Sequence, residues 1–288
     1  MKFSIILCTV DRYAIVSEFL MSLVNQSYRN FELIIVDQNS NDNLLEIVNK
    51  FRKNINIKYI KSSRGLSKSR NVAMYHSSGD VLCFPDDDCT YPPKLLENIC
   101  STFRLNDQMD FLLGRTISKH TGKISAGKDL TKSMPVRRSG FGGSSTTLFI
   151  NFRSEKPTRF LFDEAFGVGA AFYCEEENDL IIRMLKDGMQ GHYIPEKNYV
   201  FHPEKDYDYF DLERASTRGF GFGALTAKHI FSLAGFLFFV KYLLIRTPVS
   251  ILVYLIKGNI ILVKYISIKY INMWKGFYLY FTKSNINE

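Results

Sequence analysis

The sequence lacks the signatures of several common protein classes. Among its 288 residues, Pro and Gly number only 8 and 18 and no short-period repeat occurs, which excludes collagen-like and solenoid architectures. The five cysteines form no CxxC pair and have no zinc-type His spacing, so we expect no zinc finger. Neither GxGxxG after the first apolar run nor a P-loop motif occurs, which disfavours a dinucleotide-binding domain and a P-loop NTPase.

Net positive charge is scarce over most of the chain. The formal net charge is +8, but residues 228–288 carry +7 of it and residues 1–227 only +1. Nucleic-acid-binding surfaces need clustered basic side chains, so we expect no nucleic acid partner. The first apolar stretch is short and soon meets Asp11 and Arg12, unlike a signal peptide, which predicts a cytoplasmic protein.

Apolar runs alternate with helical periodicities in the first 90 residues. This alternation predicts an α/β fold with a mostly parallel, Rossmann-like sheet flanked by helices. The segments typical of strands are 3–9, 31–36, 55–60 and 80–84, of which 55–60 alternates apolar and polar residues. Ligands of such sheets bind beyond the carboxyl ends of the strands, where the sequence places Thr9, Asp11, Asp37 and Asp86–Asp88.

Three consecutive acids, Asp86, Asp87 and Asp88, follow the fourth apolar run. Side chains at i and i+2 of an extended segment share a face, so Asp86 and Asp88 can point together while Asp87 points away. Two such carboxylates suit a hard divalent cation with open positions for phosphate oxygens. A solvated acidic turn ahead of the next helix is the alternative.

Seven segments, in order along the chain, resemble the inverting family 2 glycosyltransferases with the GT-A fold, of the type that builds bacterial surface polysaccharides. They are SIILCT (4–9), LIIVDQNS (33–40), RGLSKSRN (64–71), SGDVLCFPDDD (78–88), FDE (162–164), GVGA (167–170) and EENDLIIR (176–183). We therefore predict a nucleotide-sugar-binding and catalytic domain over 1–205, a linker or loop over 206–227 and a membrane-associated helical region over 228–288.

The resemblance implies a UDP-, dTDP- or GDP-linked sugar as donor. Asp37 matches the family acid that binds the nucleoside base or ribose, and the loop after Thr9, which contains Asp11, would form the other wall. Lys68 or Arg70 would assist the departure of the negatively charged diphosphate. A solvated helix face is the alternative for both basic residues.

The resemblance also implies a metal site. Asp86 and Asp88 match the DxD motif and would hold Mn²⁺ or Mg²⁺ against the donor diphosphate, with Asp87 in the substrate-binding set. The metal would neutralise the charge that builds on the diphosphate as the sugar–phosphate bond breaks. Some GT-A enzymes add a His ligand, and His202 is the candidate here, with a purely structural His as the alternative.

A second acidic cluster, 175–177, is the candidate source of a catalytic base. Aligned on the family pattern ED-x-D-L, Glu177 stands where an Asp is usual and Glu176 one residue before it. We favour Glu177 as the group that takes the proton of the acceptor hydroxyl during attack at the anomeric carbon, with Glu176 as the alternative. Favourable interaction of these acids with a helix N-terminus is the structural alternative.

Residues 230–281 are apolar and aromatic but interrupted by single basic residues. The longest charge-free run, His229–Val240, is shorter than the roughly 18–20 residues of a spanning helix, and a longer span would bury Lys241 and Arg246. With the net charge of +7, this predicts helices lying on an anionic membrane surface. A core helix pair, an oligomer interface and a true span are the alternatives. The stretch GFGFG (219–223) is expected to be a mobile loop over the phosphates or a hinge.

These observations together predict a metal-dependent, inverting glycosyltransferase, peripheral on the inner face of the cell membrane, that extends a lipid-linked or other glycan acceptor. One rival is a nucleotidyltransferase-like enzyme, which would need a basic phosphate-binding loop after the first strand, where only Arg12 is found. The other is a catalytically silent membrane scaffold with a GT-A fold, against which the Asp86/Asp88 pair and the Glu cluster argue.

Overall fold

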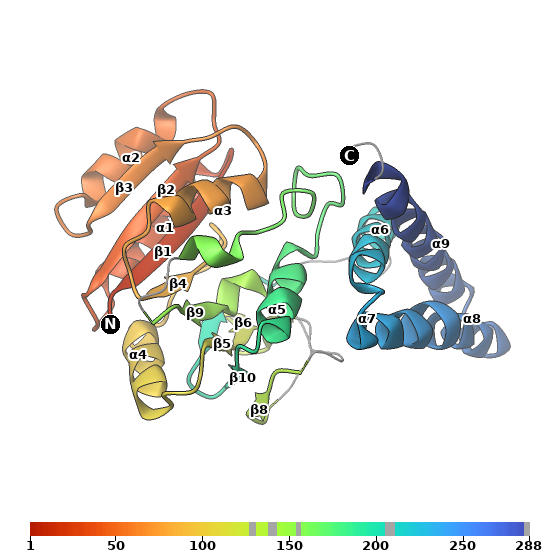
Figure 1. The fold of residues 1–288 in the computed structure, drawn as a ribbon. Coiled ribbons are helices and arrows are strands. Elements are labelled where there is room, and N and C mark those ends of the chain that lie inside the picture. Colours follow the sequence, from red (N-terminus) through yellow and green to blue (C-terminus); the bar gives the residue numbers. More distant parts are fainter. Residues whose placement is uncertain (127–130, 138–142, 154–156, 205–210, 285–288) are drawn as a thin grey trace.

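The computed structural model describes residues 1–126, 131–137, 143–153, 157–204 and 211–284. Figure 1 shows an α/β body and, at one side of it, a group of helices formed by the C-terminal part of the chain. The body contains an eight-stranded sheet of order β3-β2-β1-β4-β9-β5-β10-β8. In that order the strands span Ile57–Lys61, Phe31–Asp37, Phe3–Thr9, Val81–Cys83, Phe149–Asn151, Phe111–Leu113, Gly191–Tyr193 and Met134–Pro135.

The central sheet is mostly parallel. β1 pairs in parallel with β2 and β4, β2 with β3, and β5 with β10, whereas β8 and β9 run antiparallel to their neighbours. A smaller sheet of order β11-β6-β7 contains Tyr199–Phe201, Arg115–Ile117 and Ile124–Ala126. The α/β class and the mostly parallel sheet predicted from the alternating pattern are therefore confirmed.

Helices cover both faces of the central sheet. They are α1 (Tyr13–Val24), α2 (Asn43–Phe51), α3 (Leu66–Tyr75), α4 (Leu95–Leu105) and α5 (Glu176–Lys186), with short 3-10 turns η1 (Ser145–Thr147) and η2 (Pro157–Phe160). Ile5 and Leu7 of β1 join one apolar core with α1, α2 and α4, and Ile6 and Cys8 join a second with α3 and α5. Because both faces are covered, every residue of β1 and β2 is buried.

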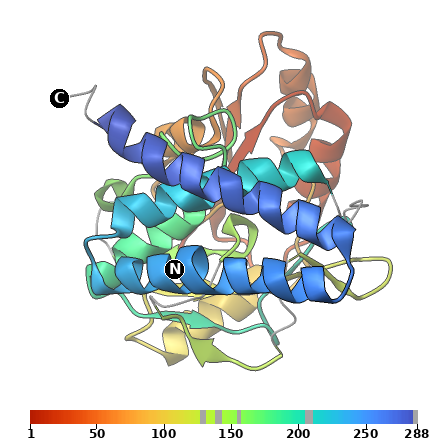
Figure 2. The same ribbon diagram turned by 90° about the vertical axis from the view of Figure 1, so that its right-hand side faces the viewer.

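The C-terminal helices form a unit beside the body. They are α6 (Leu212–His229), α7 (Leu233–Phe238), the π-helical segment η3 (Phe239–Arg246), α8 (Thr247–Ile256) and α9 (Ile260–Ser284). α9 lies across α6, and α7, η3 and α8 follow one another as one long helix (Figure 2). Among the described residues, only the stretch Gly235–Ile256 is long and apolar enough to cross a membrane, and 6% of its 18-residue apolar window is buried. It is a candidate membrane-associated segment.

The glycine-rich stretch at 219–223 lies inside α6, so the predicted loop or hinge is wrong. A Cβ added at Gly219 would lie 2.3 Å from the carbonyl oxygen of Lys269, and one at Gly223 would lie 1.9 Å from that of Met273. The absence of side chains there lets the backbones of α6 and α9 approach closely. The predicted linker over 206–227 is accordingly helical from residue 212 onward, and 206–210 lie outside the described residues.

Candidate active site

Three strand ends meet at one edge of the central sheet. Thr9 and Asp37 are the last residues of β1 and β2 and are register partners. β4 pairs with the other side of β1, and its chain runs directly into residues 86–88. The predicted polar groups therefore lie at the carboxyl edge, where sheets of this kind bind ligands.

Asp86, Asp88 and His202 converge in a cluster whose ligand atoms all lie within 4.8 Å of one another. His202 follows β11, and mutual backbone hydrogen bonds between Thr90 and Phe201 hold that strand beside the acidic loop. The His202 Nδ1 lies 2.8 Å from the carbonyl oxygen of Pro203, which can only accept, so Nδ1 carries the proton. The other ring nitrogen, Nε2, lies 3.3 Å from Asp88 Oδ1.

This cluster fits a divalent metal. The Oδ1 atom of Asp88 is buried and accepts no hydrogen bond from the described residues, as a lone pair reserved for a ligand would. Two carboxylates and an imidazole, with the second imidazole nitrogen held by a carbonyl, suit Mn²⁺ or Mg²⁺ with positions left for phosphate oxygens.

Asp87 points away from the cluster, as the spacing predicts. It accepts hydrogen bonds from Thr9 Oγ1 at 2.6 Å and from Arg12 Nη1 at 2.8 Å. Burial raises the pKa of Asp87 above its usual value, and these two donors oppose that effect. Arg12 also lies 2.9 Å from Asp88 Oδ2, a role that sequence reasoning did not assign. The one signal for this role in the sequence is that Arg12 lies three residues after the first strand.

Asp37 is completely buried, and neighbouring residues of the chain donate hydrogen bonds to both of its carboxylate oxygens. Asn39 donates to Oδ1 from its backbone and side-chain nitrogens, and Tyr59 and Lys61 donate to Oδ2. Burial would raise the pKa of Asp37, but these hydrogen bonds outweigh it and the pKa is lowered. Asp37 is thus a fixed anion under the loops that follow β1 and β2.

The loop after β1 is tied to its neighbours. The backbone nitrogen of Asp11 donates to Asn39 Oδ1 at 2.7 Å, and the exposed Asp11 carboxylate lies 2.9 Å from Arg64 Nη2. Asp11 adopts a left-handed backbone conformation with φ of 57°. Gln38 in turn accepts a hydrogen bond from the nitrogen of Gly65 at 2.8 Å. The loops that follow β1, β2 and β3 therefore form one connected rim.

Arg70 joins the two acidic clusters. Its guanidinium is 2% exposed and lies 3.1 Å from Glu176 Oε1 and 3.7 Å from Asp86 Oδ1. The rings of Phe84 and Phe162 pack against it. A solvated helix face is therefore wrong for Arg70, whereas Lys68, two residues earlier, is exposed and fits that description.

The three glutamates at the start of α5 have different environments. Glu176 is buried and paired with Arg70, and Glu175 accepts a hydrogen bond from Asn178 at 2.7 Å. Glu177 is half-buried, and its own backbone N–H donates to its carboxylate, to which no side chain of the described residues donates. Burial, with the charges of Glu176 and Glu175, raises the pKa of Glu177 well above its usual value, which makes it a stronger base.

The far side of the same helical turn carries a buried ionic network. Asp179 is completely buried and lies 2.7 Å from Lys228 Nζ, 2.9 Å from His229 Nε2 and 2.8 Å from Arg183 Nε. Burial would raise the pKa of Asp179, but these partners outweigh it and the pKa is lowered. Lys228 also binds Asp163 at 2.6 Å. The network pins α5 to α6, and the last Asp of the ED-x-D-L pattern was its only sequence signal.

The chain belongs to glycosyl transferase family 2, whose model matches residues 4–154. A poly(ribitol-phosphate) beta-N-acetylglucosaminyltransferase, TarS, of Staphylococcus aureus is 38% identical over 93 residues, which are 31% of this chain and 16% of TarS. A GalNAc(5)-diNAcBac-PP-undecaprenol beta-1,3-glucosyltransferase of Campylobacter jejuni is 27% identical over 149 residues, 49% of this chain and 47% of that protein. The matches thus span less than half of each relative's length.

Solved structures share the fold. The crystal structure of TarS 1–349 matches with a TM-score of 0.61 at 18% identity, covering 99% of this chain and 92% of that one. A Pyrobaculum calidifontis mannosyltransferase in complex with GDP-Man and Mn²⁺ matches with a TM-score of 0.65 at 12% identity, covering 95% and 87%. These likenesses confirm the GT-A fold.

Proposed function

We propose that this protein transfers a sugar from a nucleotide-diphosphate sugar to a hydroxyl of a glycan or lipid-linked acceptor, with inversion and with the help of Mn²⁺ or Mg²⁺. The observation that carries the proposal is the link between two sites: Arg70 contacts both Asp86 of the metal-type cluster and Glu176, the neighbour of the candidate base. The groups that would activate the donor and the group that would activate the acceptor are thereby linked through Arg70.

Each of the site side chains would have a role in the transfer. Asp86, Asp88 and His202 would hold the metal, which when bound neutralises charge on the departing diphosphate. The loops after β1 and β2, which include Asp11 and are held by the buried Asp37, would form the nucleoside end of the donor site, with Thr9 at the end of β1. Asp87 and Arg12 would keep the acidic loop against β1.

Glu177 would act as the base. Its carboxylate accepts the proton of the acceptor hydroxyl while that oxygen forms a bond to the anomeric carbon and the bond from this carbon to the diphosphate breaks. A single displacement of this kind inverts the anomeric carbon. Glu176 is a poorer candidate than Glu177 because it is buried and paired with Arg70.

The names of the relatives support an acceptor borne on a polymer or a lipid. One relative is named for poly(ribitol-phosphate) and another for an undecaprenol-linked glycan. We infer an acceptor of that general kind for this chain, in surface-polysaccharide synthesis, with UDP-, dTDP- or GDP-sugars as possible donors.

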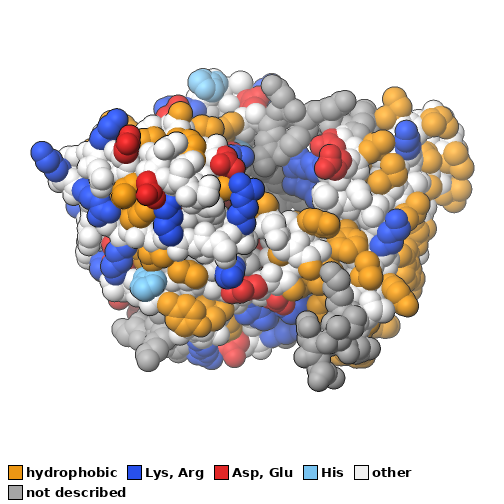
Figure 3. Space-filling view, turned by 90° about the horizontal axis from the view of Figure 1, so that it is seen from above, with side chains coloured by type: hydrophobic (Ala, Val, Ile, Leu, Met, Phe, Trp, Pro, Cys, Tyr) orange, Lys and Arg blue, Asp and Glu red, His pale blue; other side chains and the backbone are white. Residues whose placement is uncertain are grey.

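The C-terminal helices would bring the enzyme to an anionic membrane at its cytoplasmic face. Hydrophobic side chains gather on the side of the molecule formed by these helices (Figure 3). The exposed ones include Phe231, Leu233, Leu244, Val249, Leu252, Ile256 and Ile260. Apolar side chains beside a net charge of +7 suit peripheral binding to anionic lipid, and this surface is also where a second copy of the chain would pack.

The direct test is nucleotide release. Detergent-solubilised protein is incubated with a panel of nucleotide sugars, with Mn²⁺ or with EDTA, and the released nucleoside diphosphate is measured. We expect slow, metal-dependent hydrolysis of one donor, absent in Asp88→Ala. Absence of both hydrolysis and donor-induced thermal stabilisation across the panel would favour the catalytically silent scaffold instead.

A further inference from the structure

Four basic side chains gather where the C-terminal helices meet the body. Arg214 and Arg218 lie four residues apart on one face of α6, Arg246 ends η3, and Lys269 lies on α9. We call these four residues the basic cluster. Burial lowers the pKa of Lys269, Glu175 opposes this, and the charges of Arg218 and Arg246 lower it further, as expected for neighbouring cations.

Backbone contacts place the basic cluster beside the candidate base. The close approach of Gly219 to the carbonyl of Lys269 brings Arg218 and Lys269 together at the crossing of α6 and α9. Thr217 directly precedes Arg218 on α6, and its carbonyl oxygen accepts a hydrogen bond from the thiol of Cys174 at 3.7 Å. Cys174 directly precedes the glutamate cluster, so Arg218 and Lys269 lie next to the start of α5.

Three members of the basic cluster have no carboxylate in ion-pair contact within the part of the chain that the structure describes. Among the described residues, Arg218, Arg246 and Lys269 form no salt bridge, although the charge of Glu175 acts on Arg218 and Lys269. Figure 3 shows a hollow between the body and the C-terminal helices, with Lys or Arg and Asp or Glu side chains at its edge. Gathered cations at a hollow favour an anionic ligand.

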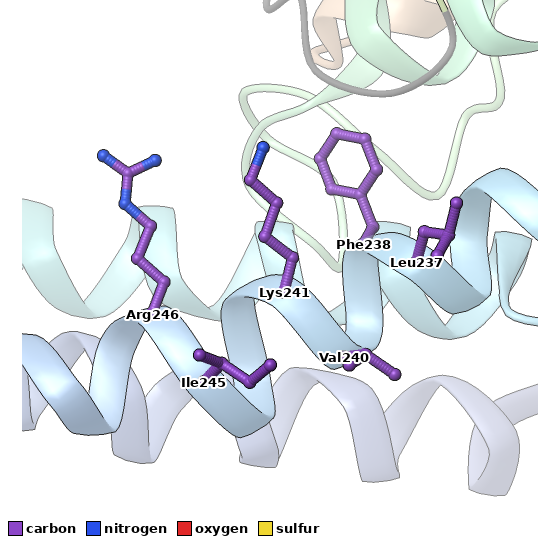
Figure 4. Close-up of a pocket in the computed structure, with 6 residues that line it drawn as sticks. All are labelled: Leu237, Phe238, Val240, Lys241, Ile245 and Arg246. Atoms are coloured by element: carbon purple, nitrogen blue, oxygen red, sulfur yellow. The ribbon is translucent and has the colours of Figure 1, made fainter.

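The helix that carries Arg246 combines charge with exposed apolar surface. Lys241 and Arg246 extend from the same side of the helix, and Val240 and Ile245 line the same pocket as these two basic residues (Figure 4). Ile245 is 55% exposed and Leu244 48% exposed. A ligand with an anionic head and an apolar chain would find partners for both within one turn of this helix.

We propose that the basic cluster binds the phosphate or diphosphate group of a membrane-borne lipid acceptor and thereby presents the acceptor hydroxyl to Glu177. The inference rests on the proposed function for the role of the bound lipid, but the binding itself requires neither donor nor metal. A lipid is favoured over a water-soluble phosphate by the exposed apolar residues beside Arg246.

The first experiment measures binding of inorganic pyrophosphate by calorimetry in EDTA, which removes metal-dependent binding at the Asp86 and Asp88 site. The double variant Arg218→Gln/Lys269→Gln is compared with Lys257→Gln/Lys264→Gln, which removes the same charge from exposed positions elsewhere on the C-terminal helices. We expect wild-type protein and the Lys257/Lys264 variant to bind pyrophosphate with equal affinity. The Arg218/Lys269 variant should bind it at least about tenfold more weakly. Equal affinity in both double variants, or no binding by wild-type protein, would overturn the site.

A second variant guards against misfolding. If the thermal melt shows that the Arg218/Lys269 variant does not fold, Arg246→Gln takes its place, since Arg246 is exposed and lies outside the crossing of α6 and α9. We expect a several-fold loss of pyrophosphate affinity from this single change. An unchanged affinity would count against the site in the same way.

The second experiment separates a lipid from a free phosphate. Co-sedimentation is measured with phosphatidylcholine vesicles, with and without a few per cent of a polyprenyl diphosphate. We expect the lipid to increase binding of wild-type protein and of the Lys257/Lys264 variant but not of the Arg218/Lys269 variant. Pyrophosphate binding without any gain from the lipid would overturn the lipid assignment. Both readouts are independent of sugar transfer, so a failed donor assay would leave them interpretable.

Discussion

Replacing Arg70 with Met removes the cation that joins the two acidic clusters and keeps a long side chain in its place. The Arg70 guanidinium is 2% exposed and binds Glu176, which is itself 6% exposed, at 3.1 Å, and Ser145 at 2.9 Å. Arg70→Met would leave the Glu176 carboxylate buried without its counter-charge. Breaking a buried pair on one side costs about 3–5 kcal/mol, so we expect the free energy of unfolding to fall by about that amount.

Urea unfolding followed by circular dichroism measures this change. Lys68→Met is the matched control, because Lys68 lies two residues earlier on the same helix and is exposed, and we expect its effect to stay within about 0.5 kcal/mol. Arg70→Met/Glu176→Gln removes both charges and should be more stable than Arg70→Met alone by at least about 1 kcal/mol. A wild-type stability for Arg70→Met, or additive effects in the double variant, would refute the buried pair.

Three further predictions concern the metal, the base and the helix crossing. Asp88→Ala should abolish Mn²⁺-dependent binding of a nucleoside diphosphate in calorimetry, and an unchanged affinity would contradict the metal cluster. Glu177→Gln should keep donor affinity and lower the transfer rate by about 10²–10⁴-fold. Because the pKa of Glu177 is raised, wild-type transfer should decline on acidification at a pH above the ordinary glutamate value of 4.5, and an acid limb at or below 4.5 would argue against this base. Gly223→Ala should destabilise the protein by about 2 kcal/mol or more, because its Cβ would lie 1.9 Å from a carbonyl oxygen of α9; an unaltered thermal melt would contradict the close crossing.

Local patterns were enough to predict the first four strands of the body. The apolar runs at 3–9 and 31–36 coincide with β1 and β2, because a strand buried on both faces needs a continuous apolar sequence. Asp86 and Asp88 lie together and Asp87 apart, as the i and i+2 rule predicted, but residues 87 and 88 form a turn instead of the extended segment that the rule assumes. His202 joined them through a strand pairing of long sequence separation, and the family resemblance was its sequence signal.

Interactions that depend on close three-dimensional approach were not predictable. Glycines at 219–223 read locally as a loop, and only the backbone of α9 against them explains why they lie in a helix. The partners of Asp37 come from the next strand and loop, so the sequence could indicate its position but not that its oxygens are already engaged by Asn39, Tyr59 and Lys61. Both cases involve contacts that no short window of sequence contains.

The ionic network at Asp179 gives the C-terminal helices a structural part in the active site. A completely buried carboxylate two residues after Glu177 would be costly without Lys228 and His229, and both come from the end of α6. Its lowered pKa means that the network stabilises the fold at pH values above the ordinary aspartate pKa of 3.8 and that this stabilisation is lost as the pH falls further. Deletion of residues 228–288 would therefore leave Asp179 without two of its partners at the turn that carries the proposed base, in addition to removing the apolar surface. The exposed apolar surface of the C-terminal helices and the start of α5, which carries the proposed base, are in this way parts of one connected unit.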